Sequence, residues 1–594
     1  MALAGNSNCL LSRQARGRRL KPPEEPMNWP DAARLYRTLR PLRWSQFAYR
    51  ARYACRRKLP GLNRRRLRSA TVSLAQLADL KAVNERVGRE LLEPVLPVDS
   101  RVLADGRLTL LNETHSVEGW GLEDSAQNRL WKVTLHYHEW LHALAEMAVA
   151  GDVQARELFF EYLNDWLARC QPPAPGVMAL AWNAYATATR IAWWSKTLLL
   201  GYKELFQQRQ DVLESMLSSL WRQARFLSAN VEWDLRGNHL VRDALGLAWA
   251  GSLFRGEEPA AWLRQAGRIA RSQANEQVLP DGAHFERSPS YHAEVRRDFL
   301  ELTRLLPPGD ADPVRNAVAR MEDFAVWTRH PDGSLLHLND GASASRHVVD
   351  GPLPTGGCCF PDAGLVAWHD PHWSVFFDAG TVGPDCQPGH AHADALTVNC
   401  SWGGRRLFVD PGCLRYDNDE SRRYDRSTAA HNTVCVDGQD SSEMWHIFRV
   451  GRRARIRDFT VDFAADGFVC QAAHDGYRFL SGAPVHARRV ELARGALAIL
   501  DKLSGAGSHR VEGGLLVSPE WAIDRHQSGW RLRSGDLALD VFCESDASLH
   551  LAATRRPWRP DYGVDLTATR ISWSYEGSLP VEVQVRVVPG GDDR

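Results

Sequence analysis

The hydrophobic period of the chain changes once, near residue 350, and this change constrains the fold more than any other feature. From about residue 30 to 345, apolar residues recur at spacings of three and four, the period of an amphipathic helix. In "RLWKVTLHYHEWLHALAEMAVAG" the positions from Leu130 to Ala148 form one stripe, and Gly151 supplies a stop signal. Many such helices joined by short polar loops predict a bundle, a solenoid or a toroid, and we favour a toroid because it leaves a cleft at one end.

The period becomes strand-like beyond "DGPLPTGGCCFPDAG", where glycine and proline cluster. Short β-branched and aromatic runs then alternate with turn signals, and Gly403-Gly404 between two such runs indicates a hairpin. Many strands with few helices predict a large antiparallel β-sandwich. The 594 residues exceed one core, so we predict a multidomain α+β chain, helical over residues 27–350 and β-sandwich over residues 351–594.

The N-terminal segment lacks the apolar run of a secretory signal, and no segment has the length needed to span a membrane. Met27 is a plausible alternative start because the periodic sequence begins there, and we expect residues 1–26 to be disordered. The sequence by itself therefore predicts a cytoplasmic location.

The charge and composition exclude partners that need a strong overall field. The net charge is +1, so we expect no nucleic-acid partner. Residues 11–70 are nevertheless rich in arginine, including Arg64, Arg65, Arg66 and Arg68, which indicates a solvated basic arm or a docking patch for an anionic polymer. The 22 tryptophans suit sugar rings, although most are expected in the core. The 11 cysteines form no CxxC framework, and we expect mostly free, buried thiols.

The stretch "GHAHADALTVNCSWGGRRLFVDPG" contains the densest group of residues that can carry chemistry. In a strand, His390, His392 and Asp394 would project from one face. Asp410 closes the next run, where an antiparallel pairing can return it to His392, and His431 in "STAAHNTVCVDG" can supply a third group. A His/Asp/His set with one open position suits zinc. A metal site and ordinary turn hydrogen bonding both remain open at this point.

The helical half holds two further unusual spots. "GNHLVRDALGLAWAG" places Asn238 and His239 at a helix start, where asparagine is commonly a cap. "FERSPSYH" begins another helix and carries Tyr291. A tyrosine at such a position usually packs its ring and exposes its hydroxyl, so neither spot identifies a catalytic site by itself.

Together these segments resemble the heparinase II/III-like family of polysaccharide lyases, and the resemblance runs through most of the chain. It is carried by "YRTLRPLRWSQFAYRAR", "LLNETHSVEGWG", "GNHLVRDALGLAWAG", "DGAHFERSPSYHAEVRRDFLEL", "GHAHADALTVNCSWGGRRLFVDPGCLRY" and "RSTAAHNTVCVDGQDSSEMW", in the family's order. The resemblance implies an incomplete (α/α) toroid followed by an antiparallel β-sandwich, with the active site between them. It implies β-elimination at a 4-linked uronic acid, and hence an anionic uronate-containing polysaccharide or oligosaccharide as the partner.

The resemblance also implies roles for individual residues. Asn238 and His390 neutralise the uronate carboxylate, His239 or Tyr291 removes the C5 proton, and Tyr291 protonates the leaving O4. His392, Asp410 and His431 match the family's structural zinc positions, and we expect Asp394 to do no direct chemistry.

Three further residues are substrate-binding candidates. Arg287 and Arg296 offer positive charge, and Tyr416 in "GCLRYDND" lies near a secondary tyrosine of the family. Family members that digest polysaccharide are generally exported, so the resemblance suggests the periplasm or cell envelope. A metal-dependent hydrolase using "HAHAD" and a non-catalytic glycan-binding protein are the alternatives. The sequence names neither the sugar nor the oligomeric state.

Overall fold

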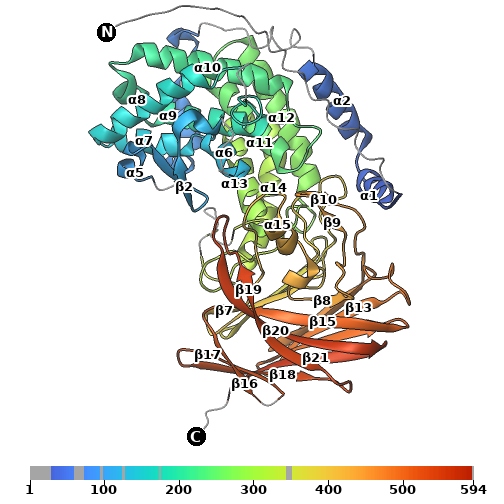
Figure 1. Ribbon diagram of the computed structural model, residues 1–594. Helices are drawn as coiled ribbons and strands as arrows, with labels where there is room; N and C mark the ends of the chain where they lie inside the picture. The colour runs from blue at the N-terminus through green and yellow to red at the C-terminus, as the bar shows by residue number, and fades with distance from the viewer. Residues whose placement is uncertain are drawn as a thin grey trace, which may run out of the picture.

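The helical and strand-rich parts of the chain occupy opposite ends of the molecule (Figure 1). The structure is a computed structural model that describes residues 29–58, 72–93, 98–122, 128–172, 176–342, 349, 351–526 and 528–590. The expected disorder of residues 1–26 and the arginine cluster at Arg64, Arg65, Arg66 and Arg68 lie outside these residues.

The N-terminal part consists mainly of helices, as the period of three and four predicts. The helices are α1 (Trp29–Leu39), α2 (Trp44–Lys58), α4 (Leu80–Val87), α5 (Ser100–Ala104), α6 (Arg129–Leu135), α7 (Glu139–Val149), α8 (Val153–Arg169), α9 (Ala184–Phe206), α10 (Gln210–Ala229), α11 (Asn238–Leu253), α12 (Glu257–Gln277), α13 (Pro289–Leu305) and α14 (Pro308–Trp327). A hairpin of β1 (Arg107–Leu110) and β2 (Glu113–Ser116), which the periodicity did not predict, precedes α6.

One predicted helix is two helices in the structure. The stripe from Leu130 to Ala148 was expected to be continuous, but α6 ends at Leu135 and α7 begins at Glu139. His138 between them has φ 65°, a left-handed conformation that no residue adopts inside an α-helix. His138 is buried, and its Nδ1 accepts a hydrogen bond of 2.9 Å from the Trp194 indole. Tertiary packing thus interrupts a helical pattern that the sequence continues.

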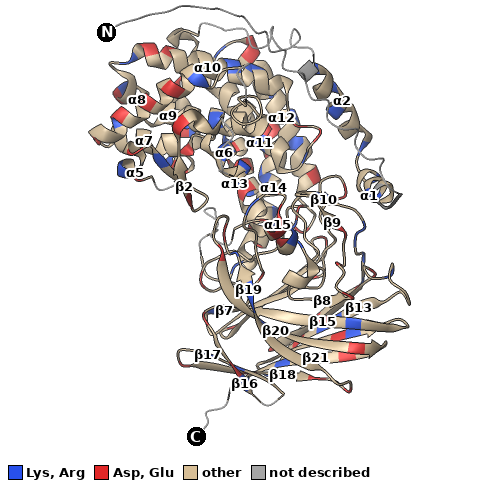
Figure 2. Ribbon diagram, viewed as in Figure 1, with Lys and Arg blue, Asp and Glu red and all other residues tan. Residues whose placement is uncertain are grey.

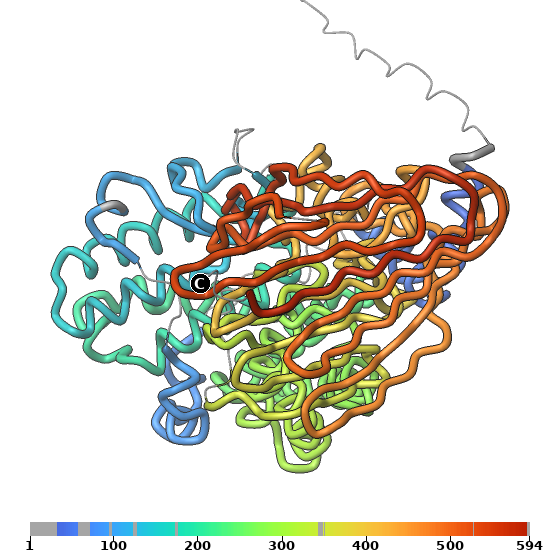
Figure 3. The backbone as a smooth tube through the Cα atoms, turned by 90° about the horizontal axis from the view of Figure 1, so that it is seen from below, coloured from blue at the N-terminus to red at the C-terminus, as the bar shows by residue number. Residues whose placement is uncertain are grey.

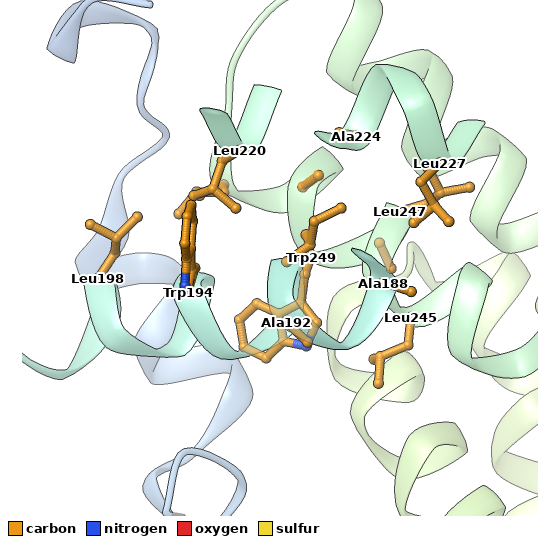
Figure 4. Close-up of a cluster of buried hydrophobic side chains, with 14 of the residues drawn as sticks. Ala188, Ala192, Trp194, Leu198, Leu220, Ala224, Leu227, Leu245, Leu247 and Trp249 are labelled. Carbon is orange, nitrogen blue, oxygen red and sulfur yellow. The ribbon is translucent and has the colours of Figure 1, made fainter. Parts of the chain in front are cut away.

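The core of the helical region forms where α9, α10 and α11 meet (Figure 4). Figure 4 labels alanine, leucine and tryptophan side chains from these three helices, among them Trp194, Leu220 and Trp249. Small residues bring α9 and α11 close together: a Cβ added to Gly246 would lie 2.7 Å from the Ala188 Cα atom. This close contact packs the middle of α11 against α9, and α11 begins with two of the candidate site residues, Asn238 and His239.

The C-terminal part forms two large antiparallel sheets, as the period of two predicts. One sheet has the order β19-β20-β15-β7-β6-β5-β4-β3, with β8 also paired to β15. Its strands are β3 (Gly356–Phe360), β4 (Leu365–His369), β5 (Trp373–Asp378), β6 (Val398–Trp402), β7 (Arg405–Phe408), β8 (Val434–Val436), β15 (Ser508–Val517), β19 (His550–Trp558) and β20 (Leu566–Ser578). The predicted hairpin is confirmed, since Gly403 and Gly404 connect β6 to β7 with φ 57° and 80°.

The other sheet has the order β11-β12-β13-β14-β21-β18-β17-β16. Its strands are β11 (Ile456–Ala464), β12 (Gly467–His474), β13 (Val485–Ala493), β14 (Ala496–Ser504), β16 (Ala522–His526), β17 (Gly529–Ser534), β18 (Leu537–Glu544) and β21 (Val581–Pro589). Seen from below, its long strands cross in front of the helical region (Figure 3). A small ribbon of β9 (Met444–Trp445) and β10 (Arg449–Val450) and the short helix α15 (Glu420–Asp425) lie between the helices and the sheets (Figure 1).

Strand β4 is buried on both faces, between the other sheet and the helical region. Val366 and Trp368 pack into a cluster shared with strands of the other sheet, such as Ile499 of β14. Leu365 and Ala367, the alternate residues of β4, pack with Phe324 of α14. Because both faces of β4 are covered, its first four residues are all apolar rather than alternating with polar ones.

Three whole-chain predictions can be compared with the described residues. Their ten cysteines are all free, and most are buried, as expected. Among the described helices, none has the length and apolarity that crossing a bilayer requires. Lysine and arginine residues are interspersed with aspartate and glutamate residues along the helices rather than separated by sign (Figure 2), as the net charge of +1 suggests.

Candidate functional site

A cavity of about 860 Å³ lies between the helical region and the loops of the β region. It is lined from the helical side by residues of α1, α6, α9, α11 and α13, and from the other side by residues 386–390, 447–450 and 561–562. Asn238, His239, Tyr291, His390 and Tyr416 all line it. The structure therefore brings together residues that the sequence separates by up to 178 positions.

Asn238 is the first residue of α11, and it is not the cap that its position suggested. The N-cap is Gly237, at φ 60°, and no side chain caps the helix. The Asn238 backbone N–H instead donates to Glu286 Oε1 at 3.0 Å. The Asn238 Oδ1 atom is buried without a hydrogen-bond partner among the described residues. A buried, unpaired amide oxygen costs free energy, so Asn238 is a candidate for binding a ligand in the cavity.

Glu286 also explains the glycine before Asn238. A Cβ added to Gly237 would lie 2.2 Å from Glu286 Oε1, so any side chain there would displace the carboxyl group. The other oxygen, Oε2, lies 3.6 Å from His390 Nε2 and has no hydrogen-bond partner among the described residues. Burial raises the pKa of Glu286, and the sequence analysis did not single this residue out.

His239 is oriented by a carboxylate that the sequence analysis also missed. Its Nδ1 lies 3.0 Å from Glu232 Oε2, and its ring packs on Tyr185 with ring centroids 4.8 Å apart. Burial opposes the charged ring, but Glu232, with smaller contributions from the charges of Glu286 and Asp234, more than offsets it, so the pKa of His239 is raised above its usual value. The ring nitrogen that Glu232 does not engage, Nε2, is the one available for proton transfer.

Tyr291 stands at the start of α13, where the Ser288 side chain accepts a hydrogen bond from its backbone N–H. Its ring stacks on His390 with the centroids 3.9 Å apart. Its hydroxyl lies 2.8 Å from the Tyr416 hydroxyl, which in turn lies 2.6 Å from the Tyr562 hydroxyl. Burial raises the pKa of Tyr291 well above its usual value, so the resting hydroxyl is protonated and can act as an acid.

Asp340 joins the catalytic candidates to the metal candidates. Its Oδ2 lies 3.0 Å from His390 Nδ1, and its Oδ1 lies 2.9 Å from His392 Nε2. Both oxygens also accept hydrogen bonds from the buried Arg422 guanidinium. Burial works to raise the pKa of Asp340, but Arg422 and the two histidines hold it well below its usual value. "LHLNDG" looks like a simple turn, so the sequence offered no signal for this role.

His392, Asp410 and His431 come together as the sequence predicted. One candidate ligand atom from each lies within 4.8 Å of the others, and all three residues are buried. His392 Nδ1 has no hydrogen-bond partner among the described residues, while its Nε2 is held by Asp340. His431 Nε2 lies 3.1 Å from the Asp425 carbonyl oxygen, and its Nδ1 lies 2.9 Å from Asp410 Oδ2. Each histidine thus has one nitrogen anchored and one turned to the cluster, the arrangement typical of metal-binding histidines.

The "HAHAD" segment differs from its expected geometry. It is irregular rather than a strand, since β6 begins only at Val398, so His390, His392 and Asp394 do not share a strand face. The two histidines share the Asp340 carboxylate, and only His392 belongs to the metal cluster. Asp394 lies outside that cluster and does not line the cavity.

The structure does not bring Arg287 and Arg296 to the cavity. The Arg287 guanidinium donates to the backbone carbonyl groups of Ala363, Phe285 and Asp362. Arg296 pairs with Glu322 at 2.7 Å. Both arginines were visible in the sequence, but the direction of each side chain depends on tertiary partners: residues 362–363 for Arg287, which precedes α13, and Glu322 of α14 for Arg296. Arg242 and Arg297 line the cavity instead.

Comparisons with known families match most of the described chain. A family described as "Heparinase II/III N-terminus" matches residues 107–368, and one described as "Heparinase II/III-like, C-terminal" matches residues 354–586.

Individual relatives extend this similarity. A heparin-sulfate lyase of Bacteroides thetaiotaomicron is 27% identical over 36% of this chain, and the match spans only 32% of that protein. The FtsZ-localized protein C of Caulobacter vibrioides is 24% identical over 70% of this chain and 71% of its own length. The crystal structure of a heparinase III superposes with a TM-score of 0.69 at 17% identity and covers 94% of both chains.

Proposed function

Because the chain belongs to the heparinase II/III-like family, we propose that it is a polysaccharide lyase that cleaves a 4-linked uronate-containing glycan by β-elimination. The same family supports an incomplete (α/α) toroid for residues 27–350 and a β-sandwich for residues 351–594. The observation that carries the proposal is that Asn238, His239, Tyr291 and His390 line the same cavity.

Neutralisation of the uronate carboxylate is the first requirement, because the C5 proton is poorly acidic beside a charged carboxylate. We assign it to Asn238 and His390. The Asn238 amide nitrogen offers two N–H donors. Its Oδ1 has no hydrogen-bond partner among the described residues, so no such bond holds the amide in another orientation. His390 Nδ1 is held by Asp340, and Glu286 Oε2 lies 3.6 Å from Nε2 without a hydrogen bond between them, so Nε2 can donate to the substrate.

Proton transfer is the second requirement. Tyr291 is assigned as the acid that protonates the leaving O4, because burial keeps its hydroxyl protonated. His239 is assigned as the base for a uronate whose C5 proton and O4 lie on opposite faces. For a uronate with both on one face, Tyr291 would have to give up its proton first, which its raised pKa opposes.

Zinc is the metal that the His392, Asp410 and His431 set suits best, with neutral histidine nitrogens and one carboxylate as ligands. The orphaned His392 Nδ1 fits this assignment. When bound, the ion would supply structural cross-linking of the loops beside the cavity. None of the three ligand candidates lines the cavity, which argues against the alternative of a hydrolase that activates water at "HAHAD".

The test is a screen of uronate polymers and oligosaccharides for the ultraviolet absorbance of an unsaturated uronate product. The panel comprises heparan sulfate, alginate, hyaluronan and chondroitin. We expect absorbance with at least one substrate, and a loss of kcat of about 10²- to 10⁴-fold in Tyr291→Phe, which retains the ring that stacks on His390.

Two outcomes would replace the proposal. Turnover without a double bond, abolished by chelation, would favour the hydrolase. Binding of a glycan by the wild-type protein without any turnover would favour a non-catalytic glycan-binding protein. Retained kcat in Tyr291→Phe would leave lyase activity intact but remove Tyr291 from the mechanism.

A further inference from the structure

Phe448 is an exposed apolar side chain inside the cavity. It lies between β9 and β10, it is 42% exposed, and it lines the cavity. Covering an apolar ring that is left in water is favourable, so a ligand that packs on it gains free energy. Single exposed apolar residues are common on protein surfaces. The exposure of Phe448 therefore has to be judged from what surrounds the ring and what holds it.

The Phe448 ring lies beside two residues of the proposed reaction. Its centroid lies 5.1 Å from that of the Tyr416 ring and 6.2 Å from that of the His390 ring, with interplanar angles of 67° and 77°. The Arg422 guanidinium lies 5.7 Å from the centroid of the Phe448 ring. These neighbours leave 42% of the residue exposed, and the residue lines the cavity. The uncovered part of the ring is therefore available to a molecule bound in the cavity.

The backbone on both sides of Phe448 is held by two buried arginines. Arg422 Nε donates to the Ile447 carbonyl oxygen at 3.0 Å. Arg426 Nη1 donates to three carbonyl oxygens at 3.1, 3.1 and 3.4 Å, which are those of His446, Ile447 and Arg449. Arg422 and Arg426 are each only 1% exposed. The ring is thus fixed in place before any ligand binds, and a side chain that is already ordered loses little freedom on binding.

Two further features hold the segment around Phe448. The Trp445 indole of β9 donates to Thr38 Oγ1 of α1 at 3.0 Å, and Thr38 also lines the cavity. His446 has φ 54°, a left-handed conformation that costs free energy in a residue other than glycine. Such strain persists where the surrounding structure imposes it, and it is common at ligand-binding sites. A strained, tightly held segment that carries an exposed ring indicates a binding role for the ring.

Resting on the proposed lyase function, we propose that Phe448 forms a sugar-binding subsite, in which its ring stacks on the apolar face of the pyranose ring next to the cleaved bond. A pyranose carries C–H groups on its faces, and an aromatic ring covers them without needing a hydrogen-bond partner. The position follows from the neighbours of Phe448. Tyr416 places its hydroxyl 2.8 Å from that of the proposed acid, Tyr291, and His390 is assigned to the uronate carboxylate. A sugar stacked on Phe448 therefore adjoins the reacting uronate.

The experiment measures binding separately from turnover. Hexasaccharides prepared from heparan sulfate, alginate, hyaluronan and chondroitin are titrated by calorimetry into Tyr291→Phe protein, with and without a second substitution at Phe448. We expect at least one hexasaccharide to bind, and Phe448→Ala to weaken its Kd by about tenfold. Phe448→Tyr keeps a flat ring and should stay within about threefold of the parent. Phe448→Leu keeps an apolar side chain without a flat ring, and should lose about as much affinity as Phe448→Ala.

A matched control and a kinetic measurement separate stacking from a general loss of structure. Phe479→Ala removes a phenylalanine that is 44% exposed but does not line the cavity, and it should leave the Kd unchanged. With the glycan that the active protein cleaves, Phe448→Ala should raise KM by about tenfold and change kcat by less than about threefold. The effect falls on KM because Asp340 still holds the His390 ring.

Each outcome bears on one of the two proposals. An unchanged Kd in Phe448→Ala would overturn the subsite while leaving the lyase function standing, and so would a fall in kcat without a change in Kd. Full affinity in Phe448→Leu would show that stacking is not the interaction. Absence of product absorbance, together with a Kd weakened by Phe448→Ala, would refute lyase activity on these glycans and support the subsite. Failure of all four hexasaccharides to bind would contradict the subsite.

Discussion

The buried ion pair between Asp340 and Arg422 provides the sharpest test of how the site is held together. Asp340→Asn keeps the shape of the side chain but removes its charge. Arg422 is 1% exposed, and it donates to both Asp340 oxygens. After the substitution the guanidinium would remain buried without a carboxylate partner, because no other acid contacts it among the described hydrogen bonds of Arg422.

The expected loss follows from that burial. Breaking a buried pair by removing one partner costs about 3 to 5 kcal/mol of unfolding free energy, since an uncompensated charge stays behind. Asp340→Asn combined with Arg422→Met should lose less than the sum of the two single variants, because no unpaired charge remains. The interaction free energy from this double-mutant cycle should be about 2 kcal/mol or more.

The matched control is the pair between Lys502 and Glu582, whose side chains are 54% and 52% exposed. Glu582→Gln should change the unfolding free energy by less than about 1 kcal/mol. Urea unfolding followed by near-ultraviolet circular dichroism measures both effects. Asp340→Asn should also lower kcat/KM by about 10- to 100-fold, because it releases the His390 ring.

Three results would each contradict part of this reasoning. If Asp340→Asn costs no more than Glu582→Gln, the buried pair does not hold the site. If the double variant is additive, Asp340 and Arg422 stabilise the protein independently. Loss of stability with unchanged kcat/KM would show that Asp340 supports the fold without orienting His390.

Three further predictions concern the base, the metal and the N-terminal helices. Glu232→Gln should move the acidic limb of the kcat/KM pH profile to lower pH. The reason is that the neutral His239 ring is the base, and removal of Glu232 lowers the raised pKa of His239. An unmoved limb would exclude His239 as that base. His392→Ala should lose zinc in metal analysis of the purified protein and should have a lower Tm. Asp394→Asn, which lies outside the cluster, should retain the metal. Zinc retained by His392→Ala would contradict the ligand set. Glu443→Gln should raise KM several-fold with kcat nearly unchanged. Glu443 is paired with Arg34 and Arg37 of α1, and α1 lines the cavity. A fall in kcat with KM unchanged would contradict a role of this contact in substrate binding.

Some of the site was predictable because motifs keep their local chemistry. The types and spacing in "GNH", "SPSYH" and "GHAH" pointed to Asn238, His239, Tyr291 and His390, and all four line one cavity. The residues that support them were not predictable. Glu232, Glu286 and Asp340 occur in segments with ordinary turn or helix patterns, and their roles depend on which side chains they meet after folding.

The sequence by itself determined the two hydrophobic periods, the Gly403-Gly404 hairpin and the residues available for chemistry, because these depend on local backbone geometry and side-chain type. Only the tertiary structure decided that the helix through His138 breaks, that "HAHAD" is irregular, and that Arg287 turns away from the cavity while Glu294 lines it. The physical reason is that the packing of the helical region against the sheets sets the partners of a side chain, and this packing joins residues distant in the sequence. A hydrophobic period reports only neighbours along one helix or strand.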